Sequence, residues 1–286
     1  MKLLVFGTTG QVATELRRHC PQDVEIRQLG RAEADLSDPA ACAALIAGTD
    51  ADVVINAAAY TAVDRAETEQ ALALTVNGTS PAEMAQAAAA RGIPFLHIST
   101  DYVFDGTGTD PWQPNTPTAP LGAYGRTKLL GEQGVAGAGG AYAILRTSWV
   151  FSAHGSNFVK TMLRLGRDCP ALRVVEDQIG GPTAASDIAT TLLRIAARFH
   201  AGTGPSGIYH YAGQPDVSWA DFAREIFRQA GLDVVVTGIP ATEYPTPALR
   251  PGNSRIDCTS LERAFGIVRP DWRISLGAVL QELKKV

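Results

Sequence analysis

Cysteine is scarce in this sequence, and long hydrophobic runs are missing. The 286 residues include four cysteines, Cys20, Cys42, Cys169 and Cys258, with no short pairing among them. Neither a zinc site nor a disulfide framework is therefore indicated. No apolar run approaches the roughly 18–20 residues that a membrane-spanning helix needs. The apolar opening at residues 1–6 is too short for a signal peptide, so we expect a cytoplasmic protein with reduced thiols and no membrane partner.

Clustered positive charge is also lacking. Lys and Arg number 25 against 29 Asp and Glu, the net charge is −4, and no long basic block occurs. Non-specific binding to nucleic acid or to acidic membranes needs such clusters, so we expect no nucleic-acid partner. Hydrophobic residues make up 45% and charged residues 19%, which is typical of a globular protein. The length suits one large or two closely joined α/β units.

The first half of the chain alternates short apolar runs with alanine-rich helical stretches. Strands are predicted at residues 2–6, 24–29, 53–57, 94–99 and 142–147. Helices are predicted at residues 11–19, 39–47, 66–90 and 121–134, with a surface loop at 134–141. Continuously apolar strands that alternate with helices predict an α/β fold with a doubly wound parallel sheet, a Rossmann arrangement. The ligand crevice of such a sheet lies at the carboxyl ends of its strands.

The pattern is looser in the second half. Helices are predicted at residues 157–166, 186–199, 219–230 and 275–284, strands at 173–175 and 208–211, and a proline-rich loop at 240–252. Ser218 is a candidate N-cap for the third of these helices. We therefore predict an NAD(P)-binding Rossmann domain at residues 1–151, to which segments near 180–215 return. Residues 152–286 form a smaller, discontinuous lobe for the substrate.

A glycine-rich turn follows the first predicted strand. Gly7 and Gly10 stand in the pattern Gly7-x-x-Gly10-x-x-Ala13, which opens the first helix. Glycine permits a tight turn and lets backbone N–H groups at the helix N-terminus approach a pyrophosphate. The pattern alone also suits an ordinary turn, but its position between strand and helix is the one a dinucleotide site requires. We therefore expect cofactor contacts from Gly7, Thr9, Gly10, Gln11 and Val12.

The end of the second predicted strand indicates which dinucleotide binds. An acidic residue there would bind the adenosine ribose and disfavour a 2′-phosphate, whereas this chain has Arg31, which can bind phosphate. We therefore expect NADPH. Because the carboxylate of Glu33 is nearby, NADH remains the alternative. Asp35 and Leu36 stand beside the expected adenine position, although Asp35 also suits a helix cap. After the third strand, small side chains allow close approach of a cofactor at Ala57, Ala58 and Ala59.

A tyrosine and a lysine four residues apart complete a catalytic pattern. Tyr124 and Lys128 share a helix face, although a lone Tyr-x-x-x-Lys also suits a solvated helix. Thr100 lies upstream at a predicted strand end. The Lys128 ammonium and an oxidised nicotinamide are expected to lower the pKa of the Tyr124 phenol from about 10. Tyr124 would then exchange a proton with an alkoxide, Lys128 would bond the nicotinamide ribose, and Thr100 would hold the carbonyl oxygen.

These motifs resemble the extended short-chain dehydrogenase/reductases, and most closely the family of dTDP-4-dehydrorhamnose reductases. The resemblance is carried by residues 7–10, 56–67, 99–106, 124–132, 146–150, 157–163 and 244–255. It implies reduction by NADPH or NADH of the C4 keto group of dTDP-4-dehydro-β-L-rhamnose to dTDP-L-rhamnose, with Thr100, Tyr124 and Lys128 as the catalytic trio. The alternatives are a reductase or epimerase of another dTDP-4-keto-6-deoxy sugar, or a non-catalytic NADP-binding regulatory subunit. A dehydratase is disfavoured because Tyr102, not a second carboxylate, follows Asp101.

The same resemblance assigns residues to the dTDP-sugar. Trp149 is one of them, although it also suits core packing. Arg250 and Arg255 are two more, although they also suit a solvated surface. An arginine in the segment 244–255 can bind a diphosphate with two parallel hydrogen bonds. The positions implied as substrate-binding are Thr100, Asp101, Trp149, Asn157, Arg250 and Arg255.

One feature departs from the family pattern. Some members dimerise through magnesium held by a glutamate in the first helix and an acidic pair after a Gly-Pro-Thr turn. Glu15 is present here, but residues 184–187 after that turn contain Asp187 alone. We therefore expect no bound metal, and a monomer or a magnesium-independent dimer.

Overall fold

The alternating first half of the chain forms one parallel sheet, as predicted. The computed structural model describes residues 1–285. Its main sheet has the order β10-β5-β4-β3-β1-β2, and every pairing in it is parallel. The strands are β1 (Lys2–Phe6), β2 (Glu25–Leu29), β3 (Val53–Asn56), β4 (Phe95–Thr100), β5 (Tyr142–Thr147) and β10 (Gly207–His210). The order reverses beside β1, which places the crevice of a doubly wound sheet at the ends of β1 and β3.

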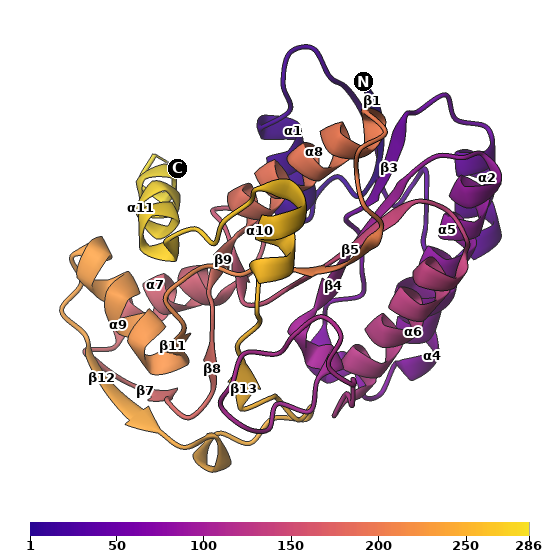
Figure 1. Ribbon diagram of the computed structural model, residues 1–286. Helices are drawn as coiled ribbons and strands as arrows, with labels where there is room; N and C mark the ends of the chain where they lie inside the picture. The colour runs from indigo at the N-terminus through magenta and orange to yellow at the C-terminus, as the bar shows by residue number, and fades with distance from the viewer. Residues whose placement is uncertain (286) are drawn as a thin grey trace.

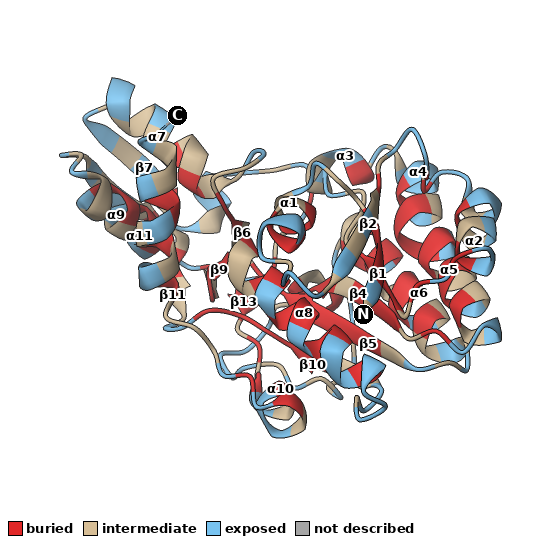
Figure 2. Ribbon diagram, turned by 90° about the horizontal axis from the view of Figure 1, so that it is seen from above, coloured by how far each residue is buried: buried red, intermediate tan, exposed pale blue. Residues whose placement is uncertain are grey.

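Helices cover both faces of this sheet (Figures 1 and 2). Leu3 and Val5 pack with α1 (Gln11–Arg18) and α8 (Ala185–His200). Leu4 and Phe6 point to the opposite face, because successive strand side chains alternate, and pack with α2 (Pro39–Ala47), α5 (Ser80–Ala90) and α6 (Ala123–Gly137). A strand buried on both sides must be apolar throughout. This explains the continuous hydrophobic run that opens the chain.

The helical stretch predicted at residues 66–90 is interrupted. It comprises the end of α3 (Val63–Ala66), then α4 (Gln70–Leu74), a π-helical turn at Thr75–Thr79, and α5. The turn buries Asn77, whose side chain accepts a hydrogen bond from Tyr60 N (2.8 Å) and donates one to Tyr60 O (3.0 Å). The break therefore anchors the loop after β3, which lies at the crevice.

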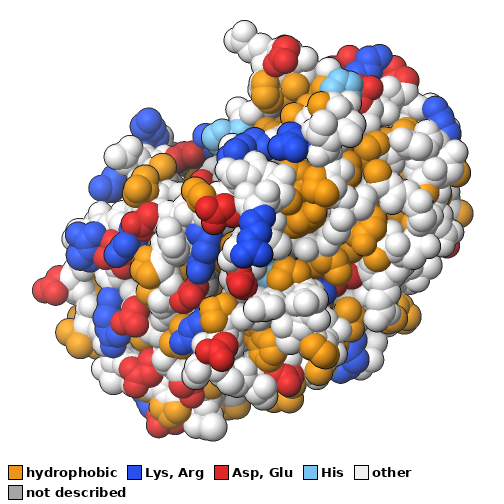
Figure 3. Space-filling view, viewed as in Figure 1, with side chains coloured by type: hydrophobic (Ala, Val, Ile, Leu, Met, Phe, Trp, Pro, Cys, Tyr) orange, Lys and Arg blue, Asp and Glu red, His pale blue; other side chains and the backbone are white. Residues whose placement is uncertain are grey.

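The second half forms a lobe with its own core. Phe222, Ile226, Trp272 and Leu276 are buried there against Phe151. Its helices are α7 (Phe158–Asp168), α9 (Trp219–Ala230) and α11 (Trp272–Leu283), and a parallel pair joins β7 (Ala171–Val175) to β12 (Val235–Ile239). Short strands of two residues join these parts: β6 (Val150–Phe151), β8 (Ile179–Gly180), β9 (Thr183–Ala184), β11 (Val217–Ser218) and β13 (Asn253–Ser254). Figure 3 shows positive and negative side chains interspersed over this lobe.

Several predicted boundaries were wrong. Helix α6 continues to Gly137, so the loop predicted at residues 134–141 is shorter, and the terminal helix begins at Trp272, where Asp271 accepts a hydrogen bond from Arg273 N (3.0 Å). Strand β12 and helix α10 (Thr259–Phe265) were not predicted. Ser218 is the N-cap of α9, as predicted. The four cysteines are free, and no helix within the described residues is long and apolar enough to cross a membrane.

Candidate active site

A cleft of about 950 Å³ opens at the carboxyl ends of the central strands. The glycine turn after β1, the ends of β3 and β4, and the start of α6 form one side of its lining. Trp149, near the end of the first domain, and Phe158 and Trp219 of the lobe contribute to the same lining. The sheet and the lobe thus meet at the place where a doubly wound sheet binds its ligand.

The glycine turn fits a pyrophosphate. Gly7 has a φ of +117°, and a Cβ at this position would lie 3.4 Å from the backbone of Ala57 and from Ala13 Cβ. Gly10 is the N-cap of α1 and offers no side chain to its N–H groups, and the first turn of α1 has no acidic residue. The positive end of the helix dipole therefore stays available to an anion. All five residues predicted here line the cleft, namely Gly7, Thr9, Gly10, Gln11 and Val12.

The residues predicted for the adenosine end also line the cleft. Arg31 is exposed, and its Nε lies 3.4 Å from Asp35 Oδ2. Glu33 accepts a hydrogen bond from Gly30 N (3.1 Å), so its carboxylate is engaged by the turn. Asp35 accepts one from Ser37 N (2.9 Å), while the cap of α2 is Asp38. The alternative of Asp35 as the helix cap is therefore wrong. The other residues placed in the cleft as predicted are Leu36, Ala57, Ala58 and Ala59.

The three predicted catalytic side chains lie in the same cleft. Thr100 ends β4, and its Oγ1 donates to Asp101 Oδ1 (3.1 Å) and accepts from Tyr102 N (3.2 Å). Tyr124 is the second residue of α6, and Lys128 follows one turn later. The Tyr124 ring stands edge-on to Tyr102 with 5.5 Å between centroids. All three side chains therefore line the cleft near the carboxyl end of β4.

The protein alone does not lower the pKa of Tyr124. Burial, and next the charge of Asp101, raise the pKa of Tyr124 to about 12, against a smaller opposite effect of the Thr100 hydroxyl. Lys128 does not lower it, because the Lys128 Nζ donates to Ile98 O (2.6 Å) and lies 3.2 Å from His97 Nε2. Burial lowers the pKa of Lys128 itself to about 8, opposed by Glu132. The protein alone thus keeps Tyr124 in its phenol form.

The N-terminus of α6 is held by a residue far away in the sequence. Ala123 N donates to Glu67 Oε1 (2.7 Å), at the helix end that attracts negative charge. Gly125 faces the carbonyl of Tyr102, where any Cβ would lie well under 3.0 Å from the oxygen. These two contacts fix the position of Tyr124. Glu67 lies 56 positions before Ala123, so sequence spacing alone does not reveal this contact.

Two of the predicted sugar contacts have marked local features. Trp149 is the one non-glycine residue with positive φ (48°) in residues 1–285, and its ring stacks on Trp219 with 3.5 Å between centroids. Asp101 is buried, and its Oδ2 has no hydrogen-bond partner among the described residues. Burial raises the pKa of Asp101 to about 6. An unpaired buried oxygen is costly, and a sugar hydroxyl could satisfy it. Thr100, Asp101 and Trp149 all line the cleft.

Three other predicted substrate residues do not line it. Asn157 caps α7 and donates to Gln11 Oε1 (2.9 Å) and Ser152 O (2.8 Å), which ties the lobe to the glycine turn. Arg250 donates to both carboxylate oxygens of Asp64 (3.1 and 2.9 Å). Arg255 donates to the side chain of Asn253 (3.1 Å). Asn157 and Arg250 pair with residues far away in the sequence, and Arg255 pairs with a residue two positions away. No spacing rule identifies these partners.

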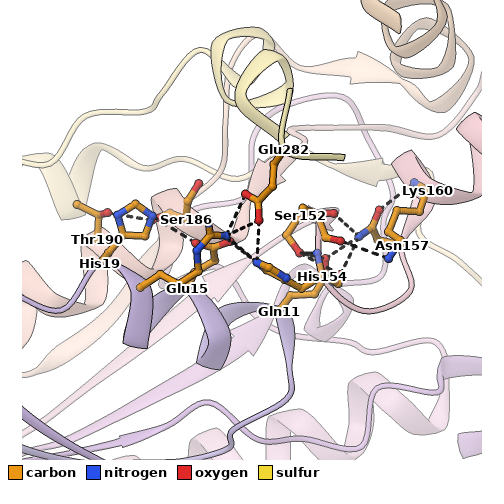
Figure 4. A network of polar contacts seen from close by, with 12 residues as sticks. Gln11, Glu15, His19, Ser152, His154, Asn157, Lys160, Ser186, Thr190 and Glu282 are labelled. Carbon is orange, nitrogen blue, oxygen red and sulfur yellow. Dashed lines mark hydrogen bonds and ion pairs between the residues drawn. The ribbon is translucent and has the colours of Figure 1, made fainter. Parts of the chain in front are cut away.

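Glu15 corresponds to the glutamate that binds magnesium in some members of the family that the sequence resembles. Here it lies in a cluster of polar side chains outside the cleft (Figure 4). Glu15, His154 and Glu282 bring three possible ligand atoms within 4.8 Å of one another. The guanidinium of Arg18 lies among them, 3.0 Å from Glu15 Oε1 and 2.8 Å from Glu282 Oε1. A cation is therefore already supplied by the chain. Asp187 is not in this cluster and accepts a hydrogen bond from Ser275 Oγ (2.7 Å).

Comparison with known proteins identifies the family. The family model described as the RmlD substrate binding domain matches residues 1–285. The dTDP-4-dehydrorhamnose reductase of Sinorhizobium fredii is 45% identical over 281 residues, which cover 96% of this chain and 95% of that protein. The chain belongs to the dTDP-4-dehydrorhamnose reductase family. This membership confirms the resemblance drawn from the motifs.

Solved structures of the family have the same fold. A dTDP-4-dehydrorhamnose reductase from Clostridium acetobutylicum superposes with a TM-score of 0.93 at 37% identity, covering 99% of this chain and 100% of that one. The reductase of Bacillus anthracis, solved in complex with NADP, gives 0.92 at 31% identity and covers 98% and 99%. The predicted α/β class and Rossmann arrangement are thereby confirmed.

Proposed function

We propose that this protein reduces the C4 keto group of dTDP-4-dehydro-β-L-rhamnose to dTDP-L-rhamnose with NADPH. The observation that carries the proposal is the single cleft that holds both the glycine turn and Thr100, Tyr124 and Lys128. Relatives named for this reaction match over nearly the whole chain, lobe included. The lobe supplies the aromatic wall of the cleft, and this wall gives the sugar nucleotide its own binding surface.

The cofactor would be held by the turn after β1. When bound, NADPH supplies the hydride. The N–H groups at the start of α1 bind its pyrophosphate, for which Gly7 and Gly10 keep the backbone accessible. Arg31 is exposed at the end of β2, and its charge favours a 2′-phosphate. Because Glu33 is engaged by Gly30, no free carboxylate opposes Arg31 there.

The proton would come from Tyr124. A phenol that stays protonated at neutral pH is a general acid for an oxygen that gains negative charge. Thr100 would turn its hydroxyl from Asp101 to the same oxygen and keep it near the phenol. Asp101 accepts from a sugar hydroxyl, and Trp149, stacked on Trp219, packs against the sugar face. Lys128 binds the ribose hydroxyls of the nicotinamide end.

The remaining assignments follow from the contacts above. Asn157 holds Gln11 and thereby supports the glycine turn. Arg250 would have to exchange Asp64 for a diphosphate to reach the substrate, and Arg255 would have to leave Asn253. We further propose a cytoplasmic monomer, or a dimer that does not depend on magnesium, because Arg18 neutralises the carboxylates beside Glu15.

The test is NADPH oxidation with the keto-sugar nucleotide, with the C4 configuration of the product read by NMR. Tyr124→Phe should lower kcat by about 10²–10⁴-fold and leave NADPH binding nearly unchanged. Tyr142→Phe is the matched control, because Tyr142 lies at the opposite end of β5 from the cleft. Wild-type turnover in a folded Tyr124→Phe variant would remove Tyr124 from the mechanism. No oxidation by the wild type would reject this substrate.

A further inference from the structure

Three polar side chains form a buried row behind the cleft. Asn56 Nδ2 lies 3.3 Å from His97 Nδ1, and His97 Nε2 lies 3.2 Å from Lys128 Nζ. They come from the end of β3, from the middle of β4 and from α6, and each is at most 2% exposed. Lys128 faces the cleft, whereas His97 does not line it. The row therefore connects a proposed catalytic group to a histidine that no motif singled out.

The hydrogen count along the row fixes the tautomer of His97. The backbone N–H of Ala58 donates to Asn56 Oδ1 (3.1 Å), so the amide NH₂ of Asn56 faces His97. An NH₂ group is a donor only, which makes His97 Nδ1 the acceptor. Burial, and next the charge of Lys128, hold the pKa of His97 well below 6.5, so the ring is neutral and carries one proton. That proton is on Nε2, the atom that faces Lys128.

The two protonation states of Lys128 fit this arrangement unequally. An ammonium has no lone pair and can only donate. A neutral amine can donate to Ile98 O (2.6 Å) and accept from His97 Nε2–H at the same time. The charged form would drive the proton of His97 to Nδ1, against the NH₂ of Asn56. Alternatively the amide would turn over, and Ala58 N–H would lose its acceptor.

We infer that His97 is a positioning residue for Lys128, with its tautomer fixed by Asn56, and that its Nε2–H stabilises the neutral amine so that Lys128 can give up a proton during turnover. The inference rests on the proposed function for its catalytic meaning. Tyr124 transfers its phenol proton to the substrate oxygen. The Lys128 ammonium, whose Nζ is held by Ile98 O and faces His97, gives one proton back to the phenolate through water in the cleft. The resulting amine accepts the His97 hydrogen bond and then regains a proton from water.

Other charged groups near Lys128 act in known directions. Glu132, one turn further along α6, favours the ammonium, but it forms a buried ion pair with Arg146 of β5 (2.6 Å). Asp101 lies beside Thr100 and raises the pKa of Tyr124, not that of Lys128. Burial lowers the pKa of Lys128 to about 8. This is close enough to neutrality for both forms to be populated.

The experiment measures the titration of Lys128 without needing turnover. Acetic anhydride reacts with the amine form alone, so the pH dependence of Lys128 acetylation, followed by mass spectrometry, reports its protonation. Asn56→Ala frees the His97 tautomer and should raise the midpoint by about one pH unit, equivalent to about 1.4 kcal/mol. In a His97→Phe background the same Asn56→Ala change should have no effect. Asn77→Ala, another buried asparagine near α6, is the matched control and should leave the midpoint in place.

A second variant covers the case in which Asn56→Ala does not fold. Asn56→Asp keeps an acceptor for Ala58 N–H and accepts from His97 Nδ1–H, so it should also raise the midpoint. The negative charge added at position 56 also acts on Lys128 directly, and this direct effect is the midpoint shift that persists in the His97→Phe background. The midpoint shift with His97 present must exceed it. Equal shifts in both backgrounds, or no shift in either, overturn the inference and leave the proposed function standing. A wild type with the expected titration but no reductase activity overturns the proposed function instead.

Discussion

The clearest perturbation of the site is a single methyl group on α6. At Gly125 a Cβ would lie well under 3.0 Å from Tyr102 O and 2.9 Å from Pro120 Cβ. Non-bonded carbon contacts are optimal at about 3.5–4.0 Å, so Gly125→Ala must move the start of α6 by about 1 Å. Tyr124 is the adjacent residue and moves with it. The change therefore displaces the proposed proton donor without altering any catalytic group.

The two energetic effects of Gly125→Ala oppose each other. Alanine is favoured over glycine inside a helix by roughly 0.5–1 kcal/mol. Overpacking costs about 1–3 kcal/mol, and here the obstructing atom is a backbone carbonyl, which cannot turn aside as a side chain would. We expect a net loss of about 1–2 kcal/mol in the free energy of unfolding. A misplacement of about 1 Å can lower the rate about 10²-fold, so kcat/KM should fall by that order.

Urea unfolding and steady-state kinetics on the same samples test this. Gly137→Ala lies at the other end of the same helix, where a Cβ would meet nothing within 4 Å. This control should raise the free energy of unfolding slightly, by up to about 1 kcal/mol, and leave kcat/KM unchanged. If Gly125→Ala behaves like Gly137→Ala in both assays, the contact with Tyr102 does not position Tyr124, and the reasoning fails.

Three further predictions concern charge. The pKa of Asp101 is raised from 3.8 to about 6 on folding, so the folded state binds more protons between these values, and the free energy of unfolding falls as pH rises through this window. At about 1.4 kcal/mol per pKa unit the loss is about 3 kcal/mol, and urea unfolding at several pH values should show it in the wild type but not in Asp101→Asn. Arg31→Ala should weaken NADPH binding about tenfold or more and leave NADH nearly unchanged by titration calorimetry, because a charge-assisted bond to the 2′-phosphate contributes about 1.5–3 kcal/mol. EDTA should change neither the mass seen by light scattering nor the activity, because Arg18 already pairs with Glu15 and Glu282.

Each of these has a contrary result. Equal pH dependence in the wild type and Asp101→Asn would mean that Asp101 ionises normally. Equal loss of both cofactors in Arg31→Ala would mean that Arg31 does not contact the 2′-phosphate. A dimer that EDTA converts to inactive monomers would mean that a cation replaces Arg18 beside Glu15.

The sequence was most informative where one local pattern determines one element. Alternation of apolar runs with helices predicted the strands of the main sheet, because a parallel strand buried on both faces must be apolar throughout. Strand β5 was predicted at its observed bounds, residues 142–147. Strands of two residues, such as β8 and β13, have no periodicity to detect, and they exist only because distant segments pair. Helix α10 was missed for the same reason, since its two core residues, Leu261 and Phe265, contact a sheet built earlier in the chain.

The site was predicted in its motifs but not in its pairings. The cleft contains every residue expected for the cofactor and all of the catalytic trio. Long-range partners were beyond reach: Arg250 meets Asp64 across 186 positions, and Lys128 meets His97 across 31. The predicted lowering of the Tyr124 pKa included an oxidised nicotinamide, whereas in the protein alone this pKa is raised. Sequence spacing cannot show which acceptors compete for the Lys128 ammonium. Burial then decides the outcome.

The order in which the main sheet is assembled has a consequence for biosynthesis. Strand β5 ends at Thr147, but its outer neighbour β10 begins at Gly207, after α7, β7 and α8. While the ribosome makes the intervening 59 residues, β5 stays an open edge, the kind of surface that pairs with other chains. A gene fragment that stops near residue 151 keeps this edge permanently. It should therefore aggregate, even though it contains the whole glycine turn and the proposed catalytic trio.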